Sequence, residues 1–330
     1  MKMKRPLMRQ GSGVVYHYTS VDTFLKLLAG IKYNYFRFWA SDIFTMNDPT
    51  EFYHGFEKLW KLLPEIEDAL YKRIRENPNN YQINTTCLDD QYRLSNIWKR
   101  KYNINVMKEW IPEYVNMLHE IFETPFVVSF SCQKDFLPMW STYGDSGKGV
   151  ALGIEVQSYY IKTKLPDGKY VIDFTKNDPT ELHSLLVTYK NVTIQHPLSF
   201  YFQTCLCKYL ASIPLISDNP ESLEKAQMDV LDKMFIIASA LIKNKSYSYE
   251  EESRLLYERW RISDVKFRTD ASKNIIPYIL VGIPIDKLKE IIIGPRCDFK
   301  FTKMIIKTRL TQLGVKFNDE NIIQSGVPFR

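Results

Sequence analysis

The chain has 330 residues, of which 45% are hydrophobic and 25% are charged. This balance excludes an intrinsically disordered protein, because disorder requires low hydrophobicity together with high net charge. The net charge of +6 favours anionic ligands. Most of the excess is spread along the chain, and we interpret the basic residues at its start as a solvated tail, with nucleic-acid contact as the alternative.

The basic start is not followed by the apolar segment of a secretory signal. The longest apolar stretch, residues 234–242, is too short to span a membrane. We therefore predict a cytoplasmic protein that does not enter membranes. The five cysteines are odd in number and irregularly spaced, which predicts buried thiols and argues against a zinc site.

The first predicted elements are short. Residues 14–18 form a predicted strand, followed by an amphipathic helix over 21–28 that Thr19 or Ser20 caps and Gly30 closes. Tyr33, Tyr35 and Arg37 alternate with Asn34, Phe36 and Phe38, and this pattern predicts a second strand. Residues 45–49 predict a loop, because Asn-Asp-Pro favours a turn.

The later elements fall into blocks. Helical periodicity covers 52–122 and about 181–243, and a last helix covers 301–313. The intervening segments predict strands at 125–131, 149–156, 252–257, 275–281 and 290–293, with a short helix at 139–143. Strands thus occur in three clusters and do not alternate regularly with helices. We predict a single α+β domain over residues 1–330, in which a mixed or antiparallel sheet carries helical insertions at about 52–122 and 181–243.

Two candidate segments lie in the first sixty residues. On the first strand, His17 and Thr19 face one side, and Tyr16 and Tyr18 face the other. This strand end enters a helix, where ligands often bind, although a structural histidine is the alternative. Residues 46–52 predict a turn and a helix cap. Their alternative is a metal site that uses Asp48, Glu51 and His54.

A third segment places two serines on one strand and two aromatic residues after them. Ser129 and Ser131 share a strand face. Trp140 and Tyr143 are three residues apart and share one face of the predicted short helix. This pattern is equally compatible with ligand contact and with a structural role.

The fourth segment carries charge on a late strand. Glu250, Glu252 and Arg254 alternate along one predicted strand face. Two carboxylates so placed repel each other, and the arginine partly neutralises them. The alternative is an exposed, charged strand edge.

Together these segments resemble a bacterial family known as domain of unknown function 2971 (DUF2971). The segments that carry the resemblance lie between residues 14 and 295. They are YHYTS, MNDPTEF, SFSCQKDFLPMWSTYGDSGKGVALGIEV, SYEEESRLLY and FRTDASKNIIPYILVGIP leading to EIIIGP. A more distant resemblance is to ADP-ribosyltransferases, which carry His-aromatic-Thr, Ser-x-Ser and Glu-x-Glu on three strands.

This second resemblance implies an ADP-ribosyltransferase-like fold and NAD as the substrate. His17 would hold the nicotinamide ribose, and Glu252 would be the catalytic carboxylate. Trp140 or Tyr143 would stack on nicotinamide. The resemblance also implies that Tyr18, Thr19, Ser129, Ser131 and Arg254 line the NAD site.

Such an enzyme would transfer ADP-ribose to a protein or nucleic-acid acceptor and would serve as a toxin or a phage-defence effector. Cleavage of the bond between nicotinamide and ribose builds positive charge on the sugar, which a carboxylate stabilises. The alternatives are a non-catalytic module that binds nucleotides or nucleic acid, and a metal-dependent nuclease or other hydrolase. The sequence does not set the oligomeric state.

Overall fold

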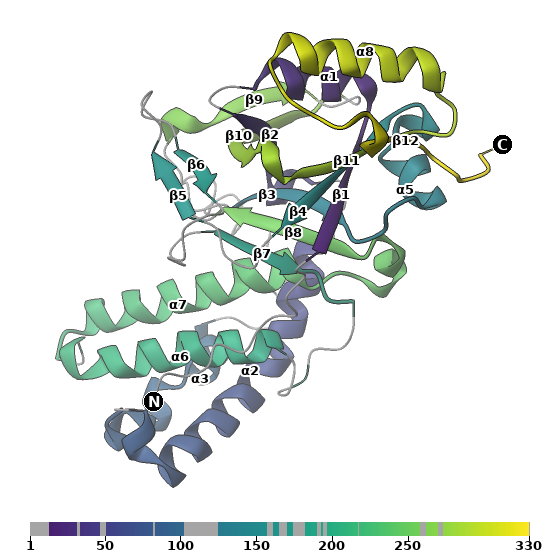
Figure 1. Ribbon diagram of the computed structural model, residues 1–330. Helices are drawn as coiled ribbons and strands as arrows, with labels where there is room; N and C mark the ends of the chain where they lie inside the picture. Colours follow the sequence, from purple (N-terminus) through teal and green to yellow (C-terminus); the bar gives the residue numbers. More distant parts are fainter. Residues whose placement is uncertain are drawn as a thin grey trace. The chain divides into compact units, whose positions relative to one another are not determined.

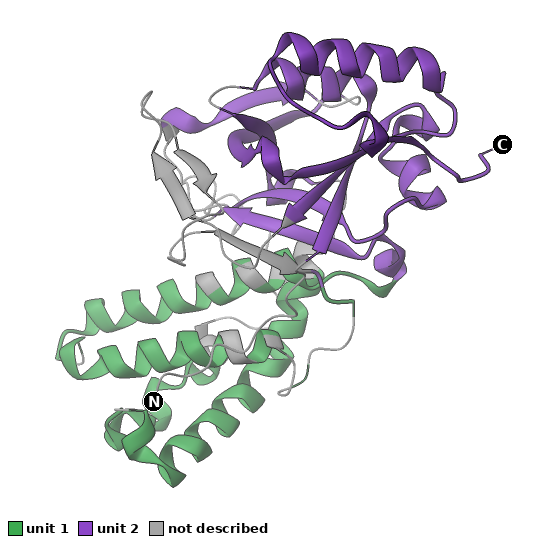
Figure 2. Cartoon of the chain, in the orientation of Figure 1, with its two compact units in different colours: residues 1–9, 47–124, 188–245 green, residues 10–46, 125–187, 246–330 purple. Residues whose placement is uncertain are grey.

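The computed structural model describes most of the chain. The described residues are 13–31, 34–46, 51–81, 83–101, 125–156, 161–164, 170–173, 182–189, 193, 197–216, 218–257, 262–269 and 273–329. The chain divides into two compact units (Figure 2). Unit 1 comprises Met1–Arg9, Asn47–Thr124 and Thr188–Lys245, and unit 2 comprises Gln10–Met46, Pro125–Val187 and Ser246–Arg330.

Unit 2 is built on a ten-stranded mixed sheet (Figure 1). Its strands are β1 (Gly13–Thr19), β2 (Tyr35–Asp42), β3 (Phe126–Ser131), β4 (Val150–Val156), β7 (Leu182–Leu186), β8 (Glu252–Tyr257), β9 (Lys266–Thr269), β10 (Ile275–Pro284), β11 (Leu288–Ile293) and β12 (Ile322–Gln324). Their order is β12-β11-β4-β1-β3-β2-β10-β9, and β8 pairs with both β3 and β7. The pairing of β11 with β12 is parallel, and the other described pairs are antiparallel. A separate hairpin joins β5 (Ile161–Lys164) to β6 (Tyr170–Asp173).

Strand β3 is the branch point of this sheet. One of its edges pairs with β8 along the whole strand, from Phe126 to Ser131. Its other edge is shared, because β1 pairs with it at Ser131 and β2 pairs with it at Val127. The strands that carry the first, third and fourth candidate segments are therefore neighbours. This confirms the predicted α+β class with a mixed sheet.

One face of the sheet packs against two helices, α1 (Val21–Ala29) and α8 (Phe299–Gln312). Alternate residues of β2, such as Phe36 and Phe38, are buried in this core with Phe24 of α1 and Ile306 of α8. Burial of each large apolar side chain contributes roughly 1.5–3 kcal/mol. Helix α1 begins as predicted, since the Oγ of its N-cap Ser20 accepts a hydrogen bond from a first-turn amide.

The opposite face carries a smaller apolar cluster beside the short helix α5 (Leu137–Thr142). Tyr16 and Tyr18 of β1 pack there against Trp140. Val327 and Phe329, near the chain end, pack on the same cluster. Both faces of β1 are therefore occupied by packed side chains.

Unit 1 is helical in its described part. Its helices are α2 (Glu51–Glu76), α3 (Leu94–Lys101), α6 (Pro197–Ile216) and α7 (Pro220–Leu241). The rings of Phe56 in α2 and Phe235 in α7 stack with centroids 4.2 Å apart. A buried carboxylate joins two helices, because Glu67 of α2 accepts hydrogen bonds from the amides of Leu94 and Ser95 at the start of α3.

The structure corrects parts of the predicted element order. Residues 182–186 form β7 rather than the start of a helix. A short run such as Leu-His-Ser-Leu-Leu fits helix and strand periods equally well, and pairing with β8 decides between them. Strands β5, β6, β9 and β12 lie where no strand was assigned from the sequence.

The helices of unit 1 fall within the two predicted insertions. That the whole chain forms one domain stays a prediction. Within the described ranges, no helix is both long and apolar enough to cross a membrane.

Candidate functional site

Four polar side chains share one face of the sheet where β3 pairs with β8. Ser131 lies directly opposite Glu252, and Ser129 lies directly opposite Arg254. Directly opposed residues of an antiparallel pair project from the same face, as do residues two apart on one strand. The structure thus brings together the serines of the third segment and the charges of the fourth.

Glu252 and Arg254 form a buried, two-pronged ion pair. The Nε of Arg254 lies 2.7 Å from Oε1 of Glu252, and its Nη2 lies 3.0 Å from Oε2. Arg254 is 0% exposed and Glu252 is 5% exposed. The alternative of an exposed strand edge is therefore wrong, because β8 lies between β3 and β7. In such a buried pair each charge depends on the other, since an unpaired charge is costly away from water.

The backbone just before β8 is strained. The sequence pattern predicts Glu250 on the strand, and this prediction is wrong. Glu250 instead ends a 3₁₀ segment over Lys245–Glu250. Glu251 follows with a φ of 41°, a left-handed conformation that costs a non-glycine residue roughly 1–3 kcal/mol. Through this bend Glu250 and Glu252 are both buried, while Glu251 is exposed. Strain of this kind is concentrated at functional sites.

Tyr143 reaches the first of these carboxylates. It follows α5, and its hydroxyl donates a hydrogen bond of 2.8 Å to Oε1 of Glu250. Burial and the nearby carboxylate of Glu250 raise the pKa of Tyr143 well above its usual value, so the phenol stays protonated. Ser131 also contacts this residue, because its Oγ donates to the backbone carbonyl of Glu250 at 2.5 Å. A tyrosine and two carboxylates therefore lie in one region of the sheet.

The two serines differ in how their hydroxyls are used. Besides its bond to Glu250, the Oγ of Ser131 accepts a hydrogen bond from the amide of Gln133. The Oγ of Ser129 is buried and has no hydrogen-bond partner among the described residues. A buried hydroxyl left unbonded costs about 1–3 kcal/mol. The Ser129 hydroxyl therefore has hydrogen-bonding capacity that no described residue uses, whereas Ser131 holds the loop that follows β3.

His17 lies on the other face of the sheet. Its neighbour Tyr16 is opposite Ser131, so the alternation of β1 directs His17 away from the serines. The imidazole contacts the ring edges of Phe38 and Phe130, with centroid distances of 5.1 and 5.7 Å. Both phenylalanines belong to the core beneath α1 and α8. The structure does not bring His17 together with Ser129 and Glu252.

The surroundings of His17 explain its structural role. Its Nδ1 lies 3.0 Å from the backbone carbonyl of Ser129, at the edge of β3 that β1 and β2 share. The ring thus donates the hydrogen bond that a strand amide would otherwise supply to this carbonyl. Burial lowers the pKa of His17 below its ordinary value. The imidazole is therefore neutral near pH 7.

Tyr18, Thr19 and Trp140 also have structural contacts. Trp140 is 0% exposed, and its Nε1 donates a hydrogen bond of 2.6 Å to Asp135. Tyr18 meets this indole edge to face with centroids 4.9 Å apart. Thr19 is buried at the end of β1. Because no ring face of Trp140 is open, Tyr143 is the better placed of the two predicted stacking residues.

The predicted metal site falls largely outside the described residues, because these exclude Asp48 and the side chain of Glu51. Within the described part of the chain, no group of three or more histidine, cysteine, aspartate or glutamate side chains is arranged to hold a metal ion.

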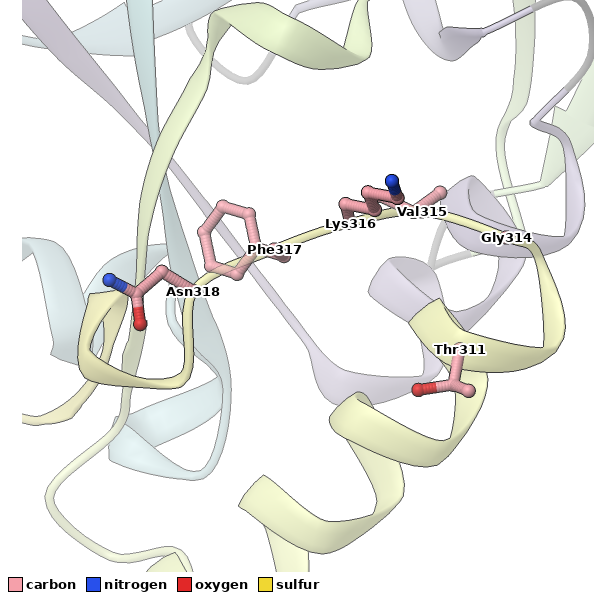
Figure 3. A pocket seen from close by; sticks show the side chains of 6 residues that line it. All are labelled: Thr311, Gly314, Val315, Lys316, Phe317 and Asn318. Atoms are coloured by element: carbon pink, nitrogen blue, oxygen red, sulfur yellow. The ribbon is translucent and has the colours of Figure 1, made fainter.

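A cavity of about 620 Å³ lies elsewhere in unit 2, after the end of α8 (Figure 3). It is lined by Thr311 and residues 314–318. None of these was a candidate from the sequence, and the lining offers one charged side chain, Lys316. It lacks the paired carboxylates of the β3–β8 face, which we keep as the candidate site.

Residues 139–255 match the model of a family described as protein of unknown function, DUF2971. This match confirms the resemblance to DUF2971 over this segment. The DUF2971 match covers about a third of the chain, and it contains Tyr143, Glu250, Glu252 and Arg254. No curated protein and no solved structure matches the chain.

Proposed function

We propose that this DUF2971 protein is an NAD-dependent ADP-ribosyltransferase-like enzyme, with Glu252 facing the reacting ribose. The observation that carries the proposal is the convergence of Glu252, Arg254 and Ser129 on one face of the sheet. The strained backbone at Glu251 supports it, because strain persists where the surrounding structure holds a side chain in a required position.

These residues suit the chemistry of the reaction. As the bond between nicotinamide and ribose breaks, positive charge develops on the sugar and is largest in the transition state. A fixed carboxylate stabilises that charge more than it stabilises the substrate. Arg254 holds Glu252 in one orientation through two hydrogen bonds, and carboxylate oxygens can accept further hydrogen bonds.

Two other side chains complete the proposed site. The Oγ of Ser129 can bond a ribose hydroxyl, and Tyr143 can stack on nicotinamide. His17 supports β3 from the opposite face through the Ser129 carbonyl. We therefore treat His17 as a positioning residue and not as a ribose ligand.

One observation favours a second candidate, a module that binds nucleotides or nucleic acid without catalysis. Both oxygens of Glu252 are already engaged by Arg254. A carboxylate neutralised in this way also serves as a structural partner for a buried arginine. The two candidates differ in one product, since only the enzyme releases nicotinamide.

The test measures NAD affinity by calorimetry and nicotinamide release by chromatography. For Glu252→Gln we expect release about 10²–10³ slower than for the wild type, with a much smaller change in NAD affinity. Glu155→Gln is the matched control, because Glu155 is a half-buried carboxylate of β4 that pairs with Lys289. Measurable NAD binding without nicotinamide release from any form would favour the non-catalytic candidate.

A second variant separates catalysis from folding. Glu252→Gln alone removes the charge that pairs with the buried guanidinium of Arg254 and weakens the fold. The double variant Glu252→Gln/Arg254→Met removes both charges and keeps the volume nearly unchanged. We expect this protein to be folded and equally slow. A folded double variant with wild-type release would contradict the role of Glu252.

A further inference from the structure

The face of the sheet that carries the candidate site continues across three more strands. Ser41 of β2 lies opposite Val127 of β3, which is two residues from Ser129 on the same face. Tyr278 of β10 lies opposite both Ser41 and Lys266 of β9. Of the side chains that β2, β10 and β9 direct to this side, we define the basic-aromatic face by six, namely Arg37, Trp39, Ser41, Lys266, Arg268 and Tyr278; apolar Ile276 and Leu280 lie among them.

The composition of this face contrasts with that of its reverse side. On β2 the intervening residues Phe36, Phe38 and Ala40 are buried in the core. Arg37 and Trp39, by comparison, are only half-buried, as are Arg268 and Tyr278, and Lys266 is exposed. These six side chains thus include three cations, two aromatic rings and no acidic residue.

The side chains are arranged in one contiguous group. The ring centroids of Trp39 and Tyr278 are 5.6 Å apart. The guanidinium carbon of Arg268 lies 5.8 Å from the centroid of Trp39, and its Nη2 donates a hydrogen bond of 3.1 Å to Ser41. Cation-π and hydrogen-bond contacts therefore hold Arg268 beside the two rings. These contacts stabilise the group before any ligand binds.

We propose that the basic-aromatic face binds single-stranded nucleic acid, and that this strand is the acceptor of the proposed ADP-ribosyl transfer. The second part rests on the proposed function. Arginine and lysine side chains attract the phosphates, and aromatic rings on a sheet stack with bases. A duplex does not offer its base faces, because they are stacked within the helix. An acidic peptide would use the charges but not the rings.

The register places this face beside the candidate site. Strand β3 separates β2 from β8, with Val127 next to Ser41 on one edge and Arg254 next to Ser129 on the other. A nucleotide stacked on Trp39 would lie two strands away from the ion pair of Glu252 and Arg254. Donor and acceptor would therefore occupy adjacent parts of one sheet face.

The experiment measures binding of short labelled DNA and RNA oligonucleotides to the full chain by fluorescence anisotropy, with no NAD present. We expect single strands to bind better than duplexes of the same sequence. Trp39→Ala should weaken single-strand binding about 10-fold or more. Arg268→Gln should reduce the slope of log affinity against log salt by about one. Trp39→Phe keeps a ring and should retain most of the affinity.

Matched controls lie on α8, where Phe301 and Lys300 supply an exposed ring and an exposed cation. Phe301→Ala and Lys300→Gln should leave the affinity unchanged, and melting curves verify the fold of every variant. The proposal is overturned if a folded Trp39→Ala binds like the wild type, if duplex binds as well as single strand, or if no oligonucleotide binds. Oligonucleotide binding without nicotinamide release would support the proposed binding surface and refute the proposed reaction. Nicotinamide release without oligonucleotide binding would support the reaction and refute the binding surface.

Discussion

The buried ion pair of β8 allows a quantitative prediction. Arg254→Met removes the cation and leaves the Glu252 carboxylate, 5% exposed, without the two hydrogen bonds at 2.7 and 3.0 Å. Two unit charges about 4 Å apart attract by roughly 4 kcal/mol at the effective dielectric constant found in proteins. Loss of one partner of a buried pair costs about 3–5 kcal/mol in measured cases. We expect a loss of this size, which is a large part of a typical stability of about 5–15 kcal/mol.

The assay is urea-induced unfolding, combined with hydrogen exchange of the amides in 126–131 and 252–257 so that the sheet is followed directly. Glu252→Gln should lower the unfolding free energy by a similar amount. The double variant Glu252→Gln/Arg254→Met should lower it by much less than the sum of the two single losses. Asp22→Asn is the control, because Asp22 pairs with Lys26 on α1 with side chains 74% and 57% exposed. Its loss should stay below about 1 kcal/mol.

The reasoning is refuted if Arg254→Met changes the unfolding free energy by no more than the Asp22 control does. It is also refuted if the double variant loses as much as the two single variants together, because the two side chains would then be energetically independent.

Two further predictions concern pH. Burial lowers the pKa of His17 below 6.5, so the unfolded chain binds more protons than the folded chain. Stability should therefore fall as the pH drops below about 6.5. His17→Gln keeps a hydrogen-bond donor for the Ser129 carbonyl and should remove this part of the slope of unfolding free energy against pH. Burial raises the pKa of Glu67 above 4.5, so the folded chain binds more protons and stability should fall as the pH rises through that interval. Glu67→Gln keeps an acceptor for the amide of Leu94 and should flatten this dependence, whereas an unchanged slope in either variant would contradict the assignment.

The sequence predicted the strands that carry His17, Ser129 and Glu252, and it predicted the two faces of β1 correctly. Alternation along β1 placed His17 opposite to Tyr16 and Tyr18, and the structure agrees. Alternation cannot say how two strands are aligned, because a shift of one residue exchanges the faces that meet. The pairing of Tyr16 with Ser131 decides this point and directs His17 into the core. The sequence alone therefore could not separate His17 from Ser129.

The sequence also could not predict that the charged residues of β8 are buried. Glu252 and Arg254 have the composition of an exposed strand, and charged residues are rarely fully buried unless they are paired. Strand β8 is not an edge strand, because β7, which was predicted as helix, pairs with its second edge. The position of Glu250 was predicted wrongly for a local reason, since the left-handed Glu251 breaks the alternation that the sequence implied.

The most direct test of the proposed function is nicotinamide release from NAD by the full chain, measured with and without a single-stranded oligonucleotide. The account predicts release by the wild type that is about 10²–10³ slower in the folded double variant Glu252→Gln/Arg254→Met. It would be contradicted by a wild type that binds NAD and oligonucleotide but releases no nicotinamide above the uncatalysed rate, or by equal release from the double variant.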